Sequence, residues 1–271
     1  MSLKLKDLYM GKFSKCLLAS LLALIPAAAA AQTIPFSFTV PAQLSTVGTA
    51  PYTQEAPLVW YADRYSPCGF TTATTPGVLT ESVCVADFQT PTPNFANTQG
   101  NKFDLLAGTN SISIYVYVPS TWELLPERLA GFWATAVNST YVVGNDYPII
   151  EFQGPTNTEV AGPSYYPNGG VAGFYGWNNT ANNGNGGWDL IGLPTGFRYN
   201  TWVKLTMTLG VNQFTYTVGT GASAKSITSP LYDSTEAYLG NVILEAYNYD
   251  TAYSIKWKTL TFSFNSNAQL K

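Results

Sequence analysis

Two glutamates are the residues whose type and position could do chemistry. Glu151 lies in the apolar run Tyr147–Gln153, and Glu245 lies in the apolar run Val242–Asn248. An ionised carboxylate in such a run is costly unless it has a partner or faces a cleft. Glycoside hydrolysis needs a pair of carboxyl groups, about 5–5.5 Å apart for retention and about 6.5–9.5 Å apart for inversion. The pair is therefore a candidate catalytic centre; the alternative is two solvent-facing acids, or acids that protect a sheet edge.

A second group of residues could bind a sugar without reacting with it. The stretch from 174 to 189 combines aromatic side chains with a run of Gly and Asn. Sugar C–H faces pack on indole and phenol rings, and amides supply hydrogen bonds. Core packing is the alternative, which we favour for Trp133 and Trp202 because they lie within strands. The residues assigned to the candidate binding site are Tyr175, Trp177, Trp188, Asn178, Gln153 and Tyr247.

The sequence contains no histidine. This excludes Ser-His-Asp and Cys-His catalysis, and it excludes metal sites that depend on an imidazole ligand. Four aspartates in turn-like stretches could join backbone carbonyls around Ca²⁺, although no ligand spacing supports such a site. They are Asp146, Asp189, Asp233 and Asp250. We expect no metal and no cofactor, with calcium as the open alternative.

The first 31 residues have the pattern of an export signal. Four lysines precede an apolar run that extends from residue 16 to residue 31, where Ala29 and Ala31 form a small-x-small cleavage signature. The run is shorter than the about 20 apolar residues that a membrane span needs, and Pro26 interrupts it. The sequence therefore predicts a bacterial-type signal peptide over 1–31 and one mature domain over 32–271. The mature protein would be secreted, periplasmic or at the cell surface; an uncleaved anchor is the alternative.

The mature chain is mildly acidic. Removal of residues 1–31 takes away four Lys and one Asp, which leaves nine Lys and Arg against fifteen Asp and Glu, a net charge of −6. Binding to a phosphate backbone needs clustered cations, so we expect no nucleic-acid partner. No second long apolar run follows, so the mature chain is not expected to span a membrane.

Cys68 and Cys84 are the cysteines that remain in the mature chain. An even pair in an exported chain predicts a disulfide, with two free buried thiols as the alternative. The bond would close the stretch Gly69–Val83, which we interpret as a loop. Closing a loop of about 15 residues contributes roughly 3 kcal/mol in the chain-entropy model.

Alternation of apolar and polar residues predicts an all-β fold, because period two is typical of half-buried strands. Within Tyr253–Phe264 the apolar phase changes midway, which predicts a β-bulge near Lys258 and Thr259. The one helix signal is the capping-box pattern Ser120–Glu123. Strands are expected over Ser111–Val118, Trp202–Leu209, Gln213–Val218, Tyr253–Phe264, Ile34–Val40, Leu58–Tyr61, Lys102–Leu106, Gly131–Asn138, Tyr147–Gln153, Val171–Trp177 and Val242–Asn248.

The order of several segments resembles a known fold family. Gly131–Val137 is followed by the strand with Glu151, then by Thr201–Leu209 and its partner strand, and last by Tyr253–Phe262. This order is similar to the concanavalin A-like lectin/glucanase jelly rolls, in which a Gly-x-Trp strand precedes a Glu strand, a Trp-x-x-Leu strand and a closing strand. The resemblance covers residues 101–265. It implies two curved antiparallel sheets with a concave face that often holds sugar, and it implies no particular activity.

The sequence departs from the catalytic branches of that group. The Glu-x-Asp-x-x-Glu run of the glucanases corresponds here to Glu151–Thr156, in which Gln153 and Thr156 replace two of the acids. The alginate-lyase-type members rely on a histidine, which the sequence lacks. A metal cluster like that of the legume lectins is not visible.

We therefore expect a two-sheet antiparallel jelly-roll sandwich, concanavalin A-like, that is exported and binds carbohydrate or a cell-surface glycan without catalysis. The first alternative is a structural or adhesive surface protein without a small ligand, which the low charge favours. The second is a glycoside hydrolase that uses Glu151 and Glu245. Convergence of these glutamates with Trp177 and Trp188 on one sheet face would favour a sugar site, and dispersal would favour the structural protein.

Overall fold

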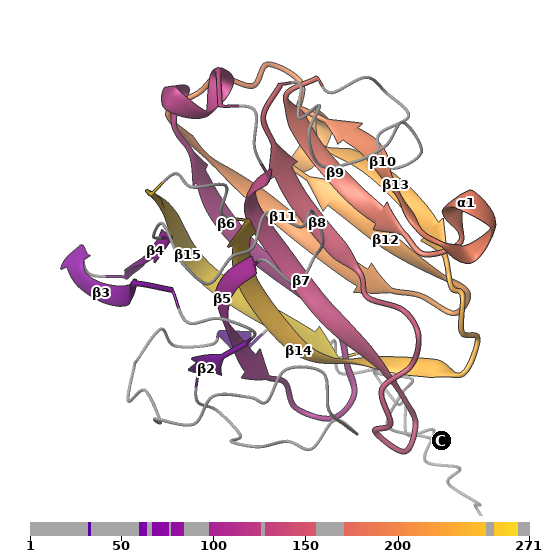
Figure 1. Cartoon of the computed structure of the whole chain (residues 1–271). Coiled ribbons are helices and arrows are strands. Elements are labelled where there is room, and N and C mark those ends of the chain that lie inside the picture. The colour runs from indigo at the N-terminus through magenta and orange to yellow at the C-terminus, as the bar shows by residue number, and fades with distance from the viewer. Residues whose placement is uncertain are drawn as a thin grey trace, which may run out of the picture.

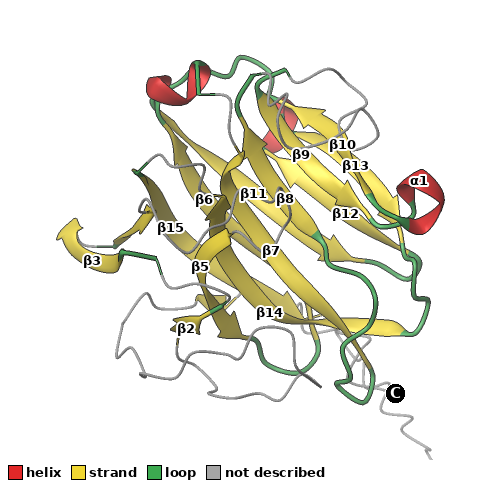
Figure 2. Cartoon of the chain, viewed as in Figure 1, coloured by secondary structure: helices red, strands yellow, loops and turns green. Residues whose placement is uncertain are grey.

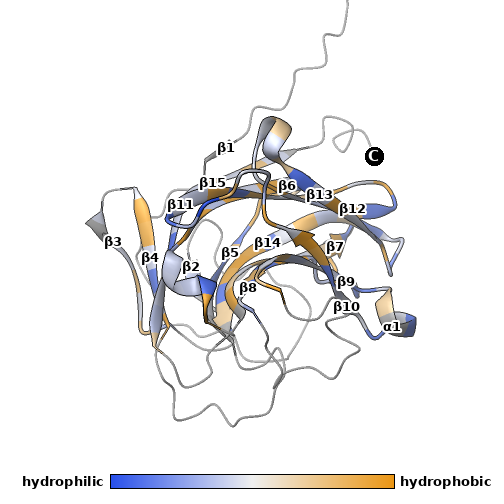
Figure 3. Ribbon diagram, turned by 90° about the horizontal axis from the view of Figure 1, so that it is seen from above, coloured by the Kyte–Doolittle hydropathy of each residue, from blue (hydrophilic) through white to orange (hydrophobic). Residues whose placement is uncertain are grey.

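The chain forms a two-layer β-sandwich. A computed structural model describes residues 32–33, 60–63, 67–75, 77–83, 98–125, 128–155, 171–247 and 252–264. These residues build two antiparallel sheets, A and B (Figure 1), which lie on top of one another when the molecule is seen from above (Figure 3). Helical structure in the described ranges is limited to α1 (Ala181–Gly184) and two 3-10 turns, η2 (Ser120–Glu123) and η3 (Gly221–Ser223) (Figure 2). The predicted all-β jelly-roll sandwich is confirmed. None of these helices has the length and apolar character to cross a bilayer.

Sheet A has the strand order β13-β12-β11-β6-β15-β4-β3, and the short β1 pairs with β15. Every neighbouring pair is antiparallel. Its strands are β1 (Gln32–Thr33), β3 (Gly69–Thr75), β4 (Val78–Val83), β6 (Thr109–Val118), β11 (Thr201–Leu209), β12 (Gln213–Val218), β13 (Lys225–Pro230) and β15 (Tyr253–Phe264).

Sheet B has the strand order β10-β9-β8-β7-β14-β5-β2, again antiparallel throughout. Its strands are β2 (Trp60–Ala62), β5 (Thr98–Asp104), β7 (Arg128–Asn138), β8 (Ile149–Gln153), β9 (Gly173–Asn178), β10 (Gly187–Gly192) and β14 (Glu236–Tyr247).

The core lies between the two sheets, and the alternation in the sequence explains it. On β11, Val203, Leu205 and Met207 are buried in the core, whereas Lys204 and Thr206 between them are only partly buried on the opposite face. The inward residues of both sheets join one continuous cluster that includes the fully buried Ile112, Ile114, Phe132, Ile150, Phe152, Phe174, Leu244 and Trp257. Alternate residues of each strand therefore lie on the outer face of its sheet, away from the other sheet.

The predicted β-bulge in β15 is confirmed. The pairing of β15 with β6 shifts register between Lys258 and Thr261, and Thr259 has a positive φ of 52°. The extra residue moves the core phase from Ile255 and Trp257 to Leu260 and Phe262, all of which are buried. β15 therefore contributes buried side chains to the core on both sides of the bulge.

Several expectations are corrected by the structure. The stretch interpreted as a loop after Cys68 forms the β3–β4 hairpin, and β10, β13 and β1 were not expected as strands. Cys68 is disulfide-bonded; Cys84 and the strand expected over Ile34–Val40 lie outside the described residues, so the Cys68–Cys84 pairing stays a prediction. At η2 the side-chain cap is absent, and the Ser120 backbone N–H instead donates to Asn200 Oδ1 at 2.9 Å.

Candidate functional site

The two glutamates lie on one face of sheet B. Directly paired residues on neighbouring strands have side chains on the same face. Gly131 on β7 pairs with Glu151 on β8 and also with Glu245 on β14. The intervening residues Phe132 and Leu244 belong to the core between the sheets, so both glutamates point away from sheet A. They are 2% and 1% exposed and lie in interior strands, so they are neither solvent-facing nor edge-protecting acids.

Glu245 extends away from Glu151. Its strand neighbour on the other side is Gly100 of β5, and a Cβ at Gly100 would lie 2.6 Å from Glu245 Cγ. The Glu245 side chain therefore covers the backbone of β5. On the opposite side, Glu151 pairs with Tyr175 of β9. The result is a row that crosses the sheet with an aromatic ring at one end.

The indole of Trp133 occupies the space between the two glutamates. A Cβ at Gly131 would lie 2.5 Å from Trp133 Nε1, so the ring edge lies directly over Gly131. β8 and β14 are two strand spacings apart, about 10 Å between backbones. A scissile bond between Glu151 and Glu245 would have to occupy the position of the indole. The geometry is therefore unsuited to the two-carboxyl hydrolysis mechanism, and the glycoside-hydrolase alternative loses its support.

Aromatic side chains form a second cluster on the same outer face. This outer aromatic cluster consists of Trp133, Ile149, Tyr175, Trp188 and Ile243, with Trp177 and Leu190 partly buried against it. Trp133 is thus buried as expected, although on the outer face and not between the sheets. The other tryptophan expected in the core, Trp202, is instead partly buried on the outer face of sheet A.

Trp177 is held from both sides. Its ring contacts Trp188 edge-on, with centroids 5.1 Å apart, and its Nε1–H donates to Asn179 Oδ1 at 3.0 Å. From sheet A, the Tyr216 hydroxyl donates to the Trp177 carbonyl at 2.8 Å. Gly176 makes room for that contact, because a Cβ there would lie 2.6 Å from the Tyr216 ring. The sequence thus fixes the Trp177 backbone while its indole remains partly accessible.

Tyr175 and Trp188 are supporting residues. They are 1% and 4% exposed. The Tyr175 hydroxyl donates to the Val171 carbonyl at 2.7 Å, and burial raises the pKa of Tyr175, so the phenol stays protonated and engaged with the backbone. Their rings hold Trp177 in place, and Trp177 is the tryptophan of the cluster that a ligand can reach.

Two buried amides on or beside this face have unused donors. Gln153 is on the same side of β8 as Glu151 and is 3% exposed, while Asn179, next to the Trp177 indole, is 8% exposed. Within the described part of the chain, neither Gln153 Nε2 nor Asn179 Nδ2 has a hydrogen-bond partner. A buried donor without an acceptor is costly, so each is a position where a polar ligand atom would be stabilised.

The structure removes Asn178 from the candidate set and adds Asn179. Asn178 lies on the other side of β9 from Trp177, where its Nδ2 donates to Asp189 Oδ2 at 2.9 Å and its Oδ1 accepts from Thr180. Asn178 therefore shapes a turn, and the donor beside Trp177 comes from its neighbour. Tyr247 pairs with Thr98 at the end of β14, but its side chain lies outside the described residues.

The aspartates considered for calcium are engaged separately. Asp146 is buried and accepts backbone N–H groups of Tyr232 and Asp233 at 2.9 and 2.8 Å. Asp233 accepts from Thr235, which lowers the pKa of Asp233, and Asp189 accepts from Asn178 as above. Asp250 lies outside the described residues. In the described ranges no three Asp, Glu or Cys side chains gather in a way that could hold a metal ion.

Glu236 and Asp146 form a buried acid pair at the end of sheet B. The Asp146 N–H donates to Glu236 Oε1 at 2.9 Å. Burial, followed by the nearby Asp146 carboxylate, raises the pKa of Glu236 to about 9. Glu236 is therefore protonated at neutral pH.

Comparisons with known proteins give structural similarities but no family. No family model matches the sequence, and no curated protein matches it. Similar solved structures include a functionally unknown protein from Saccharomyces cerevisiae, at 12% identity and a TM-score of 0.48 over 76% of this chain and 96% of that one. An alginate lyase from Klebsiella pneumoniae has 9% identity and a TM-score of 0.44 over 76% and 87%. A tetrameric galectin from the ball sponge Cinachyrella sp. has 10% identity and a TM-score of 0.36 over 62% and 99%.

Proposed function

We propose that this protein is an exported, non-catalytic carbohydrate-binding β-sandwich that holds a glycan on the outer face of sheet B. The observation that supports it is convergence. Glu151, Glu245, Trp177 and Trp188 come from four strands and share one face with the outer aromatic cluster. In this proposal the fold is a concanavalin A-like one, and its function is binding.

The proposed roles follow from the accessibility of the Trp177 indole and from the hydrogen-bonding capacity of two buried amides beneath the same face. Trp177 offers its partly exposed indole to the C–H face of a sugar ring. Gln153 and Asn179 donate to sugar hydroxyls, which would satisfy their unused N–H groups. Gln153 of β8 pairs with Gly173 at the start of β9, and Asn179 comes six residues after Gly173. The two amides are therefore about 20 Å apart along the strand direction. That length suits a chain of several sugar units and not a monosaccharide.

A glycan array with tryptophan variants tests the proposal. We expect discrete hits, and we expect Trp177→Leu to weaken binding about tenfold or more, because the ring contact is lost. Trp202→Leu is the matched control, since it removes an equally large ring from the outer face of sheet A. It should leave binding to the uncharged glycans among these hits unchanged.

A second variant separates binding from folding. Gln153→Leu should lower glycan affinity while leaving thermal stability unchanged or higher, because it removes a buried donor that has no partner in the described chain. An array without hits for the folded protein would overturn the proposal and favour the structural or adhesive alternative. The same holds if Trp177→Leu and Trp202→Leu bind equally well.

A further inference from the structure

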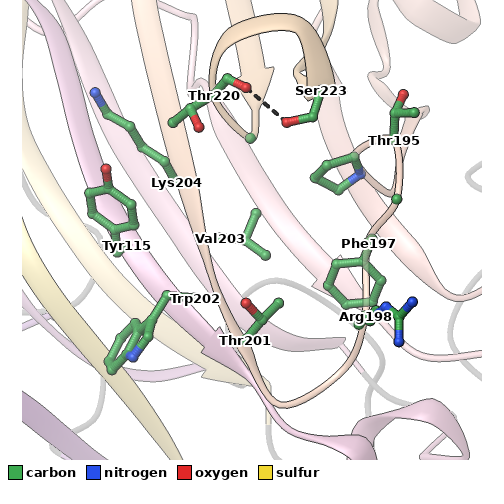
Figure 4. A pocket seen from close by; sticks show the side chains of 13 residues that line it. Tyr115, Thr195, Phe197, Arg198, Thr201, Trp202, Val203, Lys204, Thr220 and Ser223 are labelled. Carbon is green, nitrogen blue, oxygen red and sulfur yellow. Dashed lines mark hydrogen bonds between the residues drawn. The ribbon is translucent and has the colours of Figure 1, made fainter.

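A pocket on the opposite side of the molecule lies outside the proposed glycan site on sheet B. It has a volume of about 290 Å³ and lies against the outer face of sheet A at β11. The loop from Pro194 to Arg198 forms one side, the turn with Thr220 and Ser223 closes one end, and Tyr115, Trp202 and Lys204 line the other side (Figure 4). Ligand pockets span about 300–1,000 Å³, so this one has room for roughly one sugar ring.

The pocket walls are built by specific contacts. The Thr195 N–H donates to the Ser223 carbonyl at 2.9 Å, which ties the loop to the turn. Gly219 has a φ of 94° and lies so close to Pro194 that a Cβ would be 3.1 Å from the proline ring. The Gly219 N–H donates to the Lys204 carbonyl at 2.8 Å, which ties the turn to β11. The shape is therefore set by backbone contacts and does not depend on a ligand.

Lysines and aromatic rings continue from the pocket across the sheet. Register places Tyr115 of β6 between Lys204 of β11 and Lys258 of β15, and it places Trp202 beside Tyr117. Lys258 Nζ lies 4.3 Å from the Trp202 ring centroid, and Trp202 contacts Tyr117 at 5.5 Å between centroids. Lys256 Nζ lies 5.8 Å from the Tyr117 ring centroid. We call these six residues, with Arg198 at the pocket rim, the cationic aromatic face.

Within the described strands, acids do not balance the charge on this face. The described strands of sheet A carry Lys204, Lys225, Lys256 and Lys258 but one acidic residue, Glu81, which is fully buried. Sheet B has the opposite balance, with five acidic residues against Lys102 and Arg128 in its described strands. Among the described residues, no ion pair involves a residue of the cationic aromatic face. An acidic protein thus presents one positive face.

We propose that the cationic aromatic face is a binding site for an anionic polysaccharide, carboxylated or sulfated. One sugar ring occupies the pocket against Tyr115 and Trp202, with its hydroxyls near Thr195, Thr220 and Ser223. Its anionic group lies between Lys204 and Lys258, and the chain continues over Lys256. Charge complementarity selects an anionic ligand, and the aromatic rings select a sugar over a small inorganic anion.

Binding to defined polysaccharides tests this site. The probes are polygalacturonate for carboxylated chains, dextran sulfate for sulfated chains and uncharged dextran as the reference, each measured by affinity electrophoresis of the purified protein. We expect retardation by one or both anionic chains, none by dextran, and weakening as NaCl screens the charges. The more effective anionic chain identifies the kind of anion.

Variants locate the binding. Lys204→Gln combined with Lys258→Gln should weaken binding about tenfold or more, since two charge-assisted contacts are lost. Trp202→Leu keeps every charge and should also weaken it. Lys225→Gln is the matched control, because Lys225 pairs with the inward Val218 and lies on the other side of β13; it should change binding less than about twofold. Thermal unfolding of each variant reports whether the fold is retained.

Three results would overturn the proposal: binding of neither anionic chain, full binding by folded Trp202→Leu, or stronger binding of a single-stranded oligonucleotide than of either polysaccharide. The test is independent of the proposed site on sheet B. Trp177→Leu should leave anionic binding intact, whereas it should weaken glycan binding at the sheet B site. A negative result for one site therefore does not overturn the proposal for the other site.

Discussion

Glu81 is a fully buried carboxyl group on β4. Its Oε2 accepts the Trp257 indole N–H at 2.8 Å, while Oε1 has no hydrogen-bond partner in the described part of the chain. Burial raises the pKa of Glu81 to about 8, and the Trp257 hydrogen bond lowers it by a smaller amount. Glu81 is therefore mostly protonated at neutral pH.

This protonation makes stability depend on pH. The folded state keeps the Glu81 proton up to about pH 8, whereas the unfolded chain releases it near 4.5. The contribution of protonated Glu81 to the free energy of unfolding is fully present below about pH 4.5 and is lost as the pH rises towards 8. Glu81→Gln should therefore reduce the fall in Tm between pH 5 and pH 9, because the amide is shaped like the protonated acid and cannot ionise.

Glu236 provides the internal comparison for that measurement. Its pKa of about 9 also makes Tm fall as the pH rises. The Glu81→Gln variant should therefore still show part of the fall in Tm between pH 5 and pH 9. Adding Glu236→Gln should remove most of the rest. If Tm falls with pH as steeply in the double variant as in the parent protein, these two carboxyl groups are not the cause.

At the residue scale, the sequence identified the types of the site residues better than their roles. Glu151, Trp177 and Gln153 could be selected because polar and aromatic residues interrupt apolar strands. Strand alternation places Asn178 on the opposite side of β9 from Trp177. That Asn179 lies beside Trp177 depends on the turn that begins after Asn178. A local sequence window does not contain that information.

At the scale of the elements, β15 shows how a pattern can predict a local distortion. The phase change of its apolar residues located the bulge, and the structure places Thr259 there with a φ of 52°. A β-branched residue is costly in this conformation, by about 1–2 kcal/mol.

Thr259→Gly should therefore stabilise the protein by about 0.5–1 kcal/mol, with the greater freedom of glycine in the unfolded chain offsetting part of the gain. Urea unfolding of the variant measures the effect. Thr261→Gly is the matched control, since Thr261 hydrogen-bonds Ser113 at 2.8 Å in regular strand and should be destabilising when replaced. A Thr259→Gly variant less stable than the parent would show that the bulge carries no strain.

The strands that the sequence missed share a physical reason. β3 is rich in threonine, β10 places Gly187 and Asp189 at inward positions, and β13 is a polar edge strand around Ile227. Each is near or at an edge of its sheet. β10 does not alternate because it buries apolar side chains on both of its faces, Trp188 in the outer aromatic cluster and Ile191 in the core. Interior strands such as β6 and β11 bury one full face, and their alternation was visible.

At the scale of the whole molecule, the sandwich separates two kinds of surface. The outer face of sheet B combines carboxylates, amides and an aromatic cluster, while that of sheet A combines cations and aromatic rings. The sequence predicted the class of fold because strand alternation is local. It could not show that β7 pairs with both β8 and β14, since that pairing joins residues far apart in the chain.

Side-chain N–H signals provide the most direct test of the central claim, that the outer face of sheet B binds glycans. The protein, labelled with ¹⁵N, is titrated with an uncharged glycan identified on the array while the Trp177 indole, Gln153 amide and Trp202 indole signals are followed. We predict saturable shifts of the Trp177 and Gln153 signals and none of the Trp202 signal. Saturated binding that leaves the Trp177 and Gln153 signals unmoved would contradict the proposed site.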